Sequence, residues 1–382
     1  MRNVLMKTLC VILVIMLLIP SCIVMAAEED LKTLIDECVD GQKTILGVPG
    51  EDLLDKKELL PAGSSISDWS AFAFALAGAE DNYGAYIREL EKYVTSQYKE
   101  NGVLDNIKST EYHRIALTVL ALGGDPTAFG KDGSGNPVNL IADGTYNFHG
   151  ESLGLQGLNG WIFALITLDA MDYSAPEGAK FTREDMLSAI LEAQEPDGGF
   201  GLAEGASSVD ITAMALQAIG PYRDREDVSK AIDKAVDYLA GQMSESGFYM
   251  SYDVISAESS AQVIIGLCSS GIDPEKDERF TKNGNTIVDN LLSMRISDGG
   301  FAHSPGDSEG DPMATQQAMM ALLALDRLRN GEEEIYSFVS YVPPEYQTGG
   351  RGTTVIIICV AAVVLAAAVI LIIKKTRGKK NV

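Results

Sequence analysis

A repeated unit is the feature of this 382-residue chain that most restricts its fold. Glutamine (arginine in one copy), four residues, a glycine and an apolar residue recur as "QYKENGV", "QEPDGGF", "QMSESGF" and "RISDGGF", which begin at Gln97, Gln194, Gln242 and Arg295. Each copy follows a stretch with helical periodicity. Such recurrence is typical of a repeat protein.

A helix rich in Ala, Leu and Ile belongs to each unit. Aligned on one alanine, the six copies are 45 to 57 residues apart, at Ala71, Ala116, Ala164, Ala213, Ala261 and Ala318. One helix of a unit is amphipathic, as in "REDVSKAIDKAVDYLAGQ", and the other, as in "ITAMALQAIG", is apolar nearly all round. An apolar helix must be buried, and an amphipathic helix can cover it. We therefore predict an all-α fold, an α/α toroid with six inner and six outer helices.

The loops between the turns and the inner helices differ from copy to copy. They should gather where the inner helices begin, at one end of the toroid that we call the mouth, and loops of this kind often carry function. The predicted ligand-binding set at the mouth is Asp68, Trp69, Tyr112, His113, Trp161, Phe200, Asp210, Glu258, Phe301 and Gln316. For each of them the alternative is a structural role, as a core aromatic or a helix cap.

The N-terminus has the pattern of a secretory signal peptide. Arg2 and Lys7 form a basic stretch before an apolar run from Leu9 to Ile19, and Val24-Met25-Ala26 fits a cleavage site. We predict a signal peptide over residues 1–26. Lipidation at Cys22 after an earlier cleavage is the alternative.

The C-terminus has the pattern of a membrane anchor. Residues 355–373 carry no charge and would span about 28 Å as a helix, close to one hydrocarbon core. Five basic residues follow over 374–382 and predict a cytoplasmic tail. We expect residues 27–331 to form an extracellular toroid, joined by a linker over 332–354 to one transmembrane helix. Sortase attachment through "EYQTGG" is the alternative.

Charge and cysteine usage limit the partners and the redox chemistry. All 54 acidic residues lie between Glu28 and Glu345. Such a surface repels nucleic acid and anionic lipid headgroups. Cys38 and Cys268 fall in the predicted outer domain, and a disulfide between them is one alternative. The apolar surroundings of Cys268 favour a buried free thiol instead.

The turns resemble the Gln-Trp repeat of squalene cyclases. "EYHRIALTVLALGGDPTAFG" and "SSAQVIIGLCSSGIDP" resemble bacterial surface members of the prenyltransferase and squalene-cyclase repeat superfamily. The resemblance covers roughly residues 36–331. It implies an α/α toroid, as in protein prenyltransferases, class II terpene cyclases and the α-domain of cobalamin carriers, but one fold hosts many activities.

The resemblance also allows the chemistry to be tested residue by residue. Class II cyclases protonate an alkene with the acids of Asp-x-Asp-Asp-Thr-Ala, and the matching segment here is "SVDITA". Asp210 matches the middle acid, whereas Ser208 and Ile211 replace the other two. A role as helix N-cap accounts for Asp210 without catalysis. We see no set matching the zinc ligands of prenyltransferases, and we predict neither a metal nor a cofactor.

Three functions remain open. The first is a non-catalytic, membrane-anchored extracellular module that binds a small corrinoid-like or hydrophobic ligand, with cobalamin as one candidate. Cobalamin carriers use a second, β-rich domain, so a separate β-domain protein or a transporter would be the partner. The alternatives are a terpene cyclase-like or prenyltransferase-like enzyme acting on a hydrophobic substrate, with Asp210 as its one candidate acid, and a cell-surface adhesion protein that uses its outer face.

Overall fold

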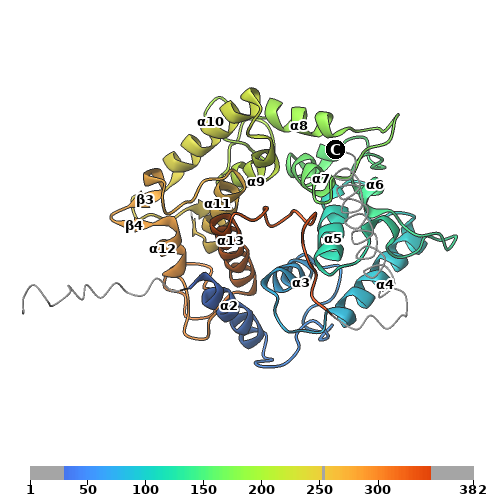
Figure 1. The fold of residues 1–382 in the computed structure, drawn as a ribbon, viewed down its shortest axis with the longest axis horizontal. Helices are drawn as coiled ribbons and strands as arrows, with labels where there is room; N and C mark the ends of the chain where they lie inside the picture. Colours follow the sequence, from blue (N-terminus) through green and yellow to red (C-terminus); the bar gives the residue numbers. More distant parts are fainter. Residues whose placement is uncertain (1–29, 252–253, 346–382) are drawn as a thin grey trace, which may run out of the picture.

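A closed double ring of helices forms the protein in the computed structural model, which describes residues 30–251 and 254–345 (Figure 1). The inner ring consists of α3 (Ser65–Ala77), α5 (Ser109–Ala121), α7 (Asn159–Asp169), α9 (Val209–Ile219), α11 (Ala257–Ser269) and α13 (Pro312–Asn330). The outer ring consists of α2 (Leu31–Ile45), α4 (Tyr83–Asn101), α6 (Leu140–Gly144), α8 (Arg183–Glu192), α10 (Glu226–Gln242) and α12 (Ile287–Leu292). The predicted α/α toroid is confirmed.

The ring closes between its first and last repeats. Each inner helix contacts the next one, and α13 contacts both α3 and α2. A Cβ atom on Gly41 of α2 would lie 2.3 Å from the backbone nitrogen of Gly300, so only glycine permits this approach. An ion pair between Glu37 and Arg295 lies beside the contact. The first outer helix is therefore locked onto the last turn.

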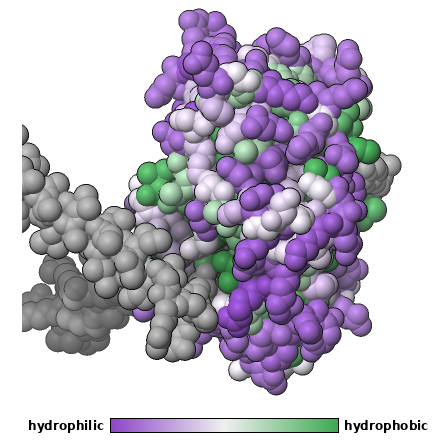
Figure 2. All heavy atoms as spheres, turned by 90° about the vertical axis from the view of Figure 1, so that its right-hand side faces the viewer, coloured by the Kyte–Doolittle hydropathy of each residue, from purple (hydrophilic) through white to green (hydrophobic). Residues whose placement is uncertain are grey.

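Burial follows the two helix types. The inner helix α11 is buried over nearly its whole length. In the outer helix α10, Val228, Ile232 and Val236 are buried, whereas Glu226 and Lys230 face solvent and pair with each other. The outer wall on the side of α6 is accordingly mainly hydrophilic (Figure 2). The difference between the two helix types places the apolar core between the rings.

The repeated turn positions one aromatic ring between neighbouring helices. Gly198 has a φ of +91°, a conformation that favours glycine, and Phe200 follows it by two residues with no exposed surface. The N–H of Phe200 donates to Oγ1 of Thr212, 2.8 Å away, which ties the turn to the start of α9. In the copy "SESGF" the positive-φ residue is Gly247 and the buried ring is Tyr249. The glycine with positive φ is therefore the fourth residue after Gln194 but the fifth residue after Gln242. The two turns are thus one residue out of step with the sequence alignment on glutamine.

Short elements complete the loops. The antiparallel pair β1 (Met250–Ser251) and β2 (Val254–Ile255) precedes α11, with Met250 opposite Ile255. The pair β3 (Thr281–Lys282) and β4 (Asn285–Thr286) precedes α12, with Thr281 opposite Thr286. Four 3₁₀ turns lie in the described part of the chain: Pro126–Ala128, Leu153–Gln156, Gly220–Tyr222 and Glu278–Phe280.

Several predictions from the sequence fall outside this description. The predicted signal peptide (1–26), with the alternative at Cys22, the transmembrane helix (355–373) and the basic tail (374–382) lie outside the described residues. Within 30–251 and 254–345, the helices are too short or too polar to cross a membrane.

Cys38 and Cys268 are both buried free thiols, and burial raises the pKa of Cys38 to about 12.

Candidate functional site: the central cavity

A cavity of about 330 Å³ lies inside the inner ring toward the mouth. Part of its wall is apolar, with aromatic rings and methionines: Trp69, Phe163, Tyr336, Met214, Met313 and Met320. The rest is polar and mostly uncharged, with amides that include Asn159, Gln262, Gln316 and Gln317. Glu111 and Arg114 are the charged residues that line it among those the structure describes. A concave space with an apolar wall and some polar groups is the usual form of a small-molecule site.

The C-terminal segment closes the cavity on the side away from the mouth. After α13 the chain crosses the centre of the ring (Figure 1), and Ile335, Tyr336 and Phe338 are buried there. The ring of Tyr336 lies 6.2 Å from that of Trp69 and 6.4 Å from that of Phe163, measured between centroids. The sequence predicted a linker from residue 332. The structure instead packs this part of the segment into the toroid, because its apolar side chains fill the channel that the six helices leave.

A row of amides connects neighbouring inner helices. Nε2 of Gln217 donates to Oε1 of Gln262 over 2.9 Å, and Nε2 of Gln262 donates to Oε1 of Gln317 over 3.1 Å. The amide nitrogen of Gln316 donates a hydrogen bond to Sδ of Met320. These amide donors are thus already engaged within the wall. The row fixes the side chains of α9, α11 and α13 in one arrangement.

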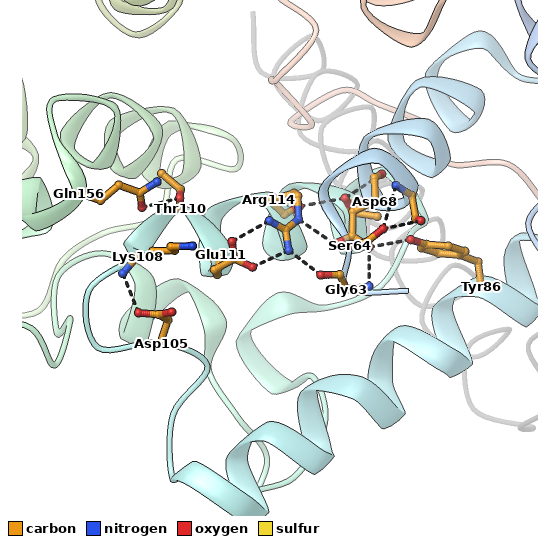
Figure 3. A network of polar contacts seen from close by, with 12 residues as sticks. Gly63, Ser64, Asp68, Tyr86, Asp105, Lys108, Thr110, Glu111, Arg114 and Gln156 are labelled. Atoms are coloured by element: carbon orange, nitrogen blue, oxygen red, sulfur yellow. Dashed lines mark hydrogen bonds and ion pairs between the residues drawn. The ribbon is translucent and has the colours of Figure 1, made fainter. Parts of the chain in front are cut away.

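The two charged residues of the wall neutralise each other (Figure 3). Both terminal nitrogens of Arg114 bond the carboxylate of Glu111, over 2.7 Å and 3.1 Å. Its Nε donates to Asp68 over 2.8 Å, and one terminal nitrogen also donates to the carbonyl of Gly63. Burial raises the pKa of Asp68, while Arg114 and the hydroxyl of Tyr86 act in the opposite direction. One guanidinium therefore serves two carboxylates.

Two further carboxylates lie at the rim of the mouth. Asp210 and Glu258 are the second residues of α9 and α11, a position at which Ile66 and Met313 line the cavity in α3 and α13. Oδ1 of Asp210 is buried, and no donor among the described residues bonds it. Burial raises the pKa of Asp210, the hydroxyl of Ser259 acts in the opposite direction, and the nearby carboxylate of Glu258 again favours the higher pKa.

Glu258 is itself held in place. Oε2 of Glu258 lies 2.9 Å from Nδ1 of His303 and accepts a hydrogen bond from Ser256 over the same distance. The hydrogen bond to Glu258 raises the pKa of His303. Across residues 30–251 and 254–345, no three His, Cys, Asp or Glu side chains converge as a metal site would require. The rim therefore offers an acid, Asp210, beside a carboxylate and a histidine.

The structure separates the ten predicted site residues into three groups. Trp69 and Gln316 line the cavity, and Asp210 and Glu258 lie at its rim. The others pack between helices among the residues described: Asp68, Tyr112, His113, Trp161, Phe200 and Phe301. Asp68, His113 and Trp161 were chosen with an alignment on alanine, which does not keep one position of the helix. Tyr112, Phe200 and Phe301 were chosen as aromatic residues expected at the mouth. Trp161, for example, is the third residue of α7, whereas His113 is the fifth of α5.

The buried polar members of the last group have structural partners. Nε2 of His113 donates to the carbonyl of Gly144 over 2.6 Å, and burial lowers the pKa of His113 to about 4. The hydroxyl of Tyr112 accepts hydrogen bonds from the N–H groups of Leu104 and Asp105. Asp210 is not a helix N-cap either, because Ser208 caps α9 by accepting a hydrogen bond from Ile211. The cap interpretation of Asp210 was therefore wrong.

Several residues of the wall were missed. They are Glu111, Arg114, Asn159, Phe163, Met214, Gln262, Met313, Gln317, Met320 and Tyr336. Counting from the helix start would have found some of them, because the second and sixth residues share a face: Met313 and Gln317 in α13, or Glu258 and Gln262 in α11. Tyr336 had no such signal, since its segment has no repeat to align with.

The family match settles which fold family this toroid represents. The model of the prenyltransferase alpha-alpha toroid domain matches residues 147–281 and 231–355, together more than half of the chain. The chain belongs to this family. The suspected superfamily relationship is thereby confirmed.

The curated relatives are terpene-cyclase-type enzymes. The drimenyl diphosphate synthase of Streptomyces showdoensis is 24% identical over 211 residues, which cover 54% of this chain and 38% of the relative. The drimenyl diphosphate synthase of Streptantibioticus cattleyicolor is 28% identical over 138 residues, which cover 35% of this chain and 25% of the relative. The chain thus spans well under half the length of either. These likenesses favour the enzyme alternative over the non-catalytic module that we expected.

Solved structures of two different enzymes match with TM-scores below 0.5. A type II terpene cyclase from Scytonema, in complex with geranylgeranyl dihydroxybenzoate, matches with a TM-score of 0.46 and 11% identity, covering 78% of this chain and 99% of that one. An unsaturated glucuronyl hydrolase from Bacillus sp. GL1 matches with a TM-score of 0.46 and 12% identity, covering 81% of this chain and 100% of that one. Two such different enzymes match equally well.

Proposed function

We propose that the protein takes a hydrophobic, isoprenoid-type molecule into its central cavity through the mouth. The observation that carries the proposal is the cavity wall, in which three aromatic rings and three methionines surround about 330 Å³. This volume is at the lower end of the range for small-molecule sites. A farnesyl chain suits it, whereas a corrinoid is far bulkier and would have to remain at the mouth. The family and the drimenyl diphosphate synthase relatives support an isoprenoid as the ligand class.

Intrinsic fluorescence can test this proposal directly. The chain has two tryptophans, of which Trp69 lines the cavity and Trp161 packs against Phe181. In a Trp161→Phe variant of the full chain, titration with farnesol should change the Trp69 emission in a saturable way. The matched Trp69→Phe variant, which retains Trp161, should respond much less. An equal response of both variants, or none, would contradict the proposal.

Chemical conversion of the bound molecule is the second candidate function. The specific observation in its favour is Asp210, an acid at the rim whose pKa is raised by burial and which lies beside Glu258. A carboxylic acid that is kept protonated can donate its proton to an alkene. Asp210→Asn should then abolish product formation from farnesol or farnesyl diphosphate while leaving binding intact. If the wild-type chain forms no product, the protein is a binding module.

Export and anchoring remain proposals from the sequence. We infer that the toroid is extracellular and that residues 355–373 hold it in the membrane, with a β-domain protein or a transporter as the partner that would receive a ligand. Protease treatment of intact cells should then remove the toroid and leave a membrane-bound C-terminal fragment. A full-length chain that survives the treatment would contradict this arrangement.

A further inference from the structure

Exposed apolar side chains gather around the mouth. Most of the large apolar side chains that are exposed in the described chain lie there, and every inner helix has at least one at or shortly before its start: Ile66, Ile107, Leu155, Leu202, Met250, Val254 and Met313. The outer wall on the side of α6 is, by contrast, mainly hydrophilic (Figure 2). Apolar side chains that are exposed together within a polar border are typical of an interaction surface.

The loops that lead to α5, α7 and α9 pack against one another. A Cβ atom on Gly150 would lie 2.5 Å from the carbonyl oxygen of Asn106 and 2.9 Å from Cδ1 of Leu155, so the first two loops meet at this glycine. A Cβ atom on Gly157 would lie 2.6 Å from Cδ1 of Leu202, which belongs to the third loop. Three successive loops therefore present their apolar side chains side by side.

The same loops are strongly acidic. Residues 102–108, 145–158, 195–208 and 296–311 lead to α5, α7, α9 and α13, and Lys108 is the one Lys or Arg in these four segments. Their exposed carboxylates are Glu151, Asp197, Glu204, Asp307 and Glu309. The mouth thus combines an apolar surface with a border of negative charge. A protein surface with an apolar centre and a border of Lys and Arg is complementary to it.

Other occupants fit this surface less well. The carboxylates would repel a membrane with anionic headgroups, and a second copy of the chain would bring the same acids face to face. The described C-terminal segment lies at the opposite end, where Tyr341 bonds the carbonyls of Ala75 and Ala121. A cationic partner protein is therefore favoured by the charge of the loops.

We infer that the mouth is the docking surface for a partner protein that carries an apolar patch bordered by lysine or arginine. The exposed apolar side chains supply the buried area, and the acidic loops attract and orient the partner. Docking at this surface covers the entrance to the cavity. The docking surface does not depend on which ligand the cavity takes, so a chain that binds no farnesol can still bind this partner.

Amphipathic helical peptides of equal length can serve as probes of this surface. One is built from leucine and lysine, one from leucine and glutamate, and one from alanine and lysine. Hydrogen–deuterium exchange of the full chain would locate the protected segments. We expect the leucine–lysine peptide to protect residues 102–108, 145–158 and 195–208, the alanine–lysine peptide to bind roughly tenfold more weakly, and the leucine–glutamate peptide to protect nothing.

Four results would overturn the inference. They are protection of the outer helices in place of the mouth, equal protection by the leucine–glutamate peptide, equal protection by the alanine–lysine peptide, and no protection by any peptide. Protection of the same loops by phosphatidylcholine vesicles alone would identify a membrane as the occupant instead. Protection that rises with protein concentration in the absence of peptide would identify a second copy of the chain.

A first pair of variants tests the apolar side chains. Leu155→Ser combined with Leu202→Ser should weaken binding of the leucine–lysine peptide roughly tenfold. Met171→Ser combined with Val339→Ser is the matched control, because these side chains are also exposed but lie at the end away from the mouth. All four side chains are exposed, so thermal unfolding should change little. Equal losses of binding in test and control would overturn the inference.

A second pair of variants tests the charge. Glu204→Gln combined with Glu309→Gln should weaken binding of the leucine–lysine peptide and make it less sensitive to salt. Glu177→Gln combined with Glu278→Gln is the control, because these exposed acids follow α7 and α11 at the end away from the mouth. The same change in both double variants would mean that only the overall charge of the chain attracts the peptide, which would overturn the inference.

Discussion

The two ends of the toroid differ in what contacts the ends of the six inner helices. At the end away from the mouth, the hydroxyl of Tyr341 donates to the carbonyls of Ala75 and Ala121, over 3.0 Å and 3.1 Å. The N–H of Phe338 donates to the carbonyl of Ala170. At the mouth, side chains cap α3, α9, α11 and α13, and an open cavity of about 330 Å³ lies between the helices.

The end that contacts the C-terminal segment therefore contributes mainly to stability, whereas the mouth contributes to function. The C-terminal segment supplies aromatic rings and hydrogen bonds to the end away from the mouth, beside a second pocket of about 440 Å³ that Asp169, Arg223 and Glu334 help to line. At the mouth, aromatic and methionine side chains instead line an open cavity that the protein itself does not fill. Tyr336 belongs to both regions, because it fills the channel and also lines the cavity.

The largest effect is expected where the two ends meet. Tyr336→Ala removes a ring that packs against Trp69, Phe72 and Phe163, and should lower the free energy of unfolding by about 3–5 kcal/mol. Urea unfolding of the full chain measures it. A loss below about 1 kcal/mol would mean that the segment only rests on the toroid, and the contrast between the ends would disappear.

The second test asks whether the charged part of the mouth is structural. Arg114→Met leaves the carboxylate of Asp68 buried without its cation and should reduce the free energy of unfolding by about 3 kcal/mol. The matched Glu111→Gln change affects a partly exposed carboxylate and should reduce it by less than about 1 kcal/mol. Equal losses for the two variants would contradict the division between the buried carboxylate of Asp68 and the partly exposed carboxylate of Glu111.

The third test uses pH. The pKa of His113 is lowered to about 4 by burial, against an ordinary value near 6.5 in the unfolded chain. Between these values the unfolded chain binds the extra proton, so stability should fall as the pH drops from 6.5 toward 4, by at most about 3 kcal/mol. His113→Gln should make the unfolding free energy less sensitive to pH in this window. An unchanged pH dependence would indicate that His113 is accessible to a proton or a ligand.

The smallest effect concerns the hydrogen bonds that Tyr341 makes at the end of the toroid away from the mouth. Tyr341→Phe keeps the ring beside Phe338 and removes the hydroxyl that bonds two carbonyls. The loss should be about 1 kcal/mol, with ligand binding at the mouth unchanged. Weaker farnesol binding in this variant would show that the two ends are coupled, contrary to the separation described above.

Sequence reasoning succeeded where one physical rule acts on many residues. The contrast between all-round apolar and amphipathic helices, repeated six times, predicted the toroid. It identified Trp69 and Gln316 in the cavity wall and brought Asp210 and Glu258 to the rim. It failed for Asp68 and His113, because a polar residue inside an apolar helix can turn toward a neighbouring helix as readily as toward a cavity. The contribution of Tyr336 depends on where the chain runs after the last helix, which no local pattern encodes.

The functional surface of this protein should be the cavity at its mouth. Photo-crosslinking of the full chain with a benzophenone ester of farnesol, followed by peptide mapping, tests this, because benzophenone reacts readily with methionine. We expect adducts on Met214, Met313 or Met320, which line the cavity, and their loss when excess farnesol competes. Adducts on the outer wall, or labelling that farnesol does not reduce, would contradict it and favour a protein that acts through its outer face.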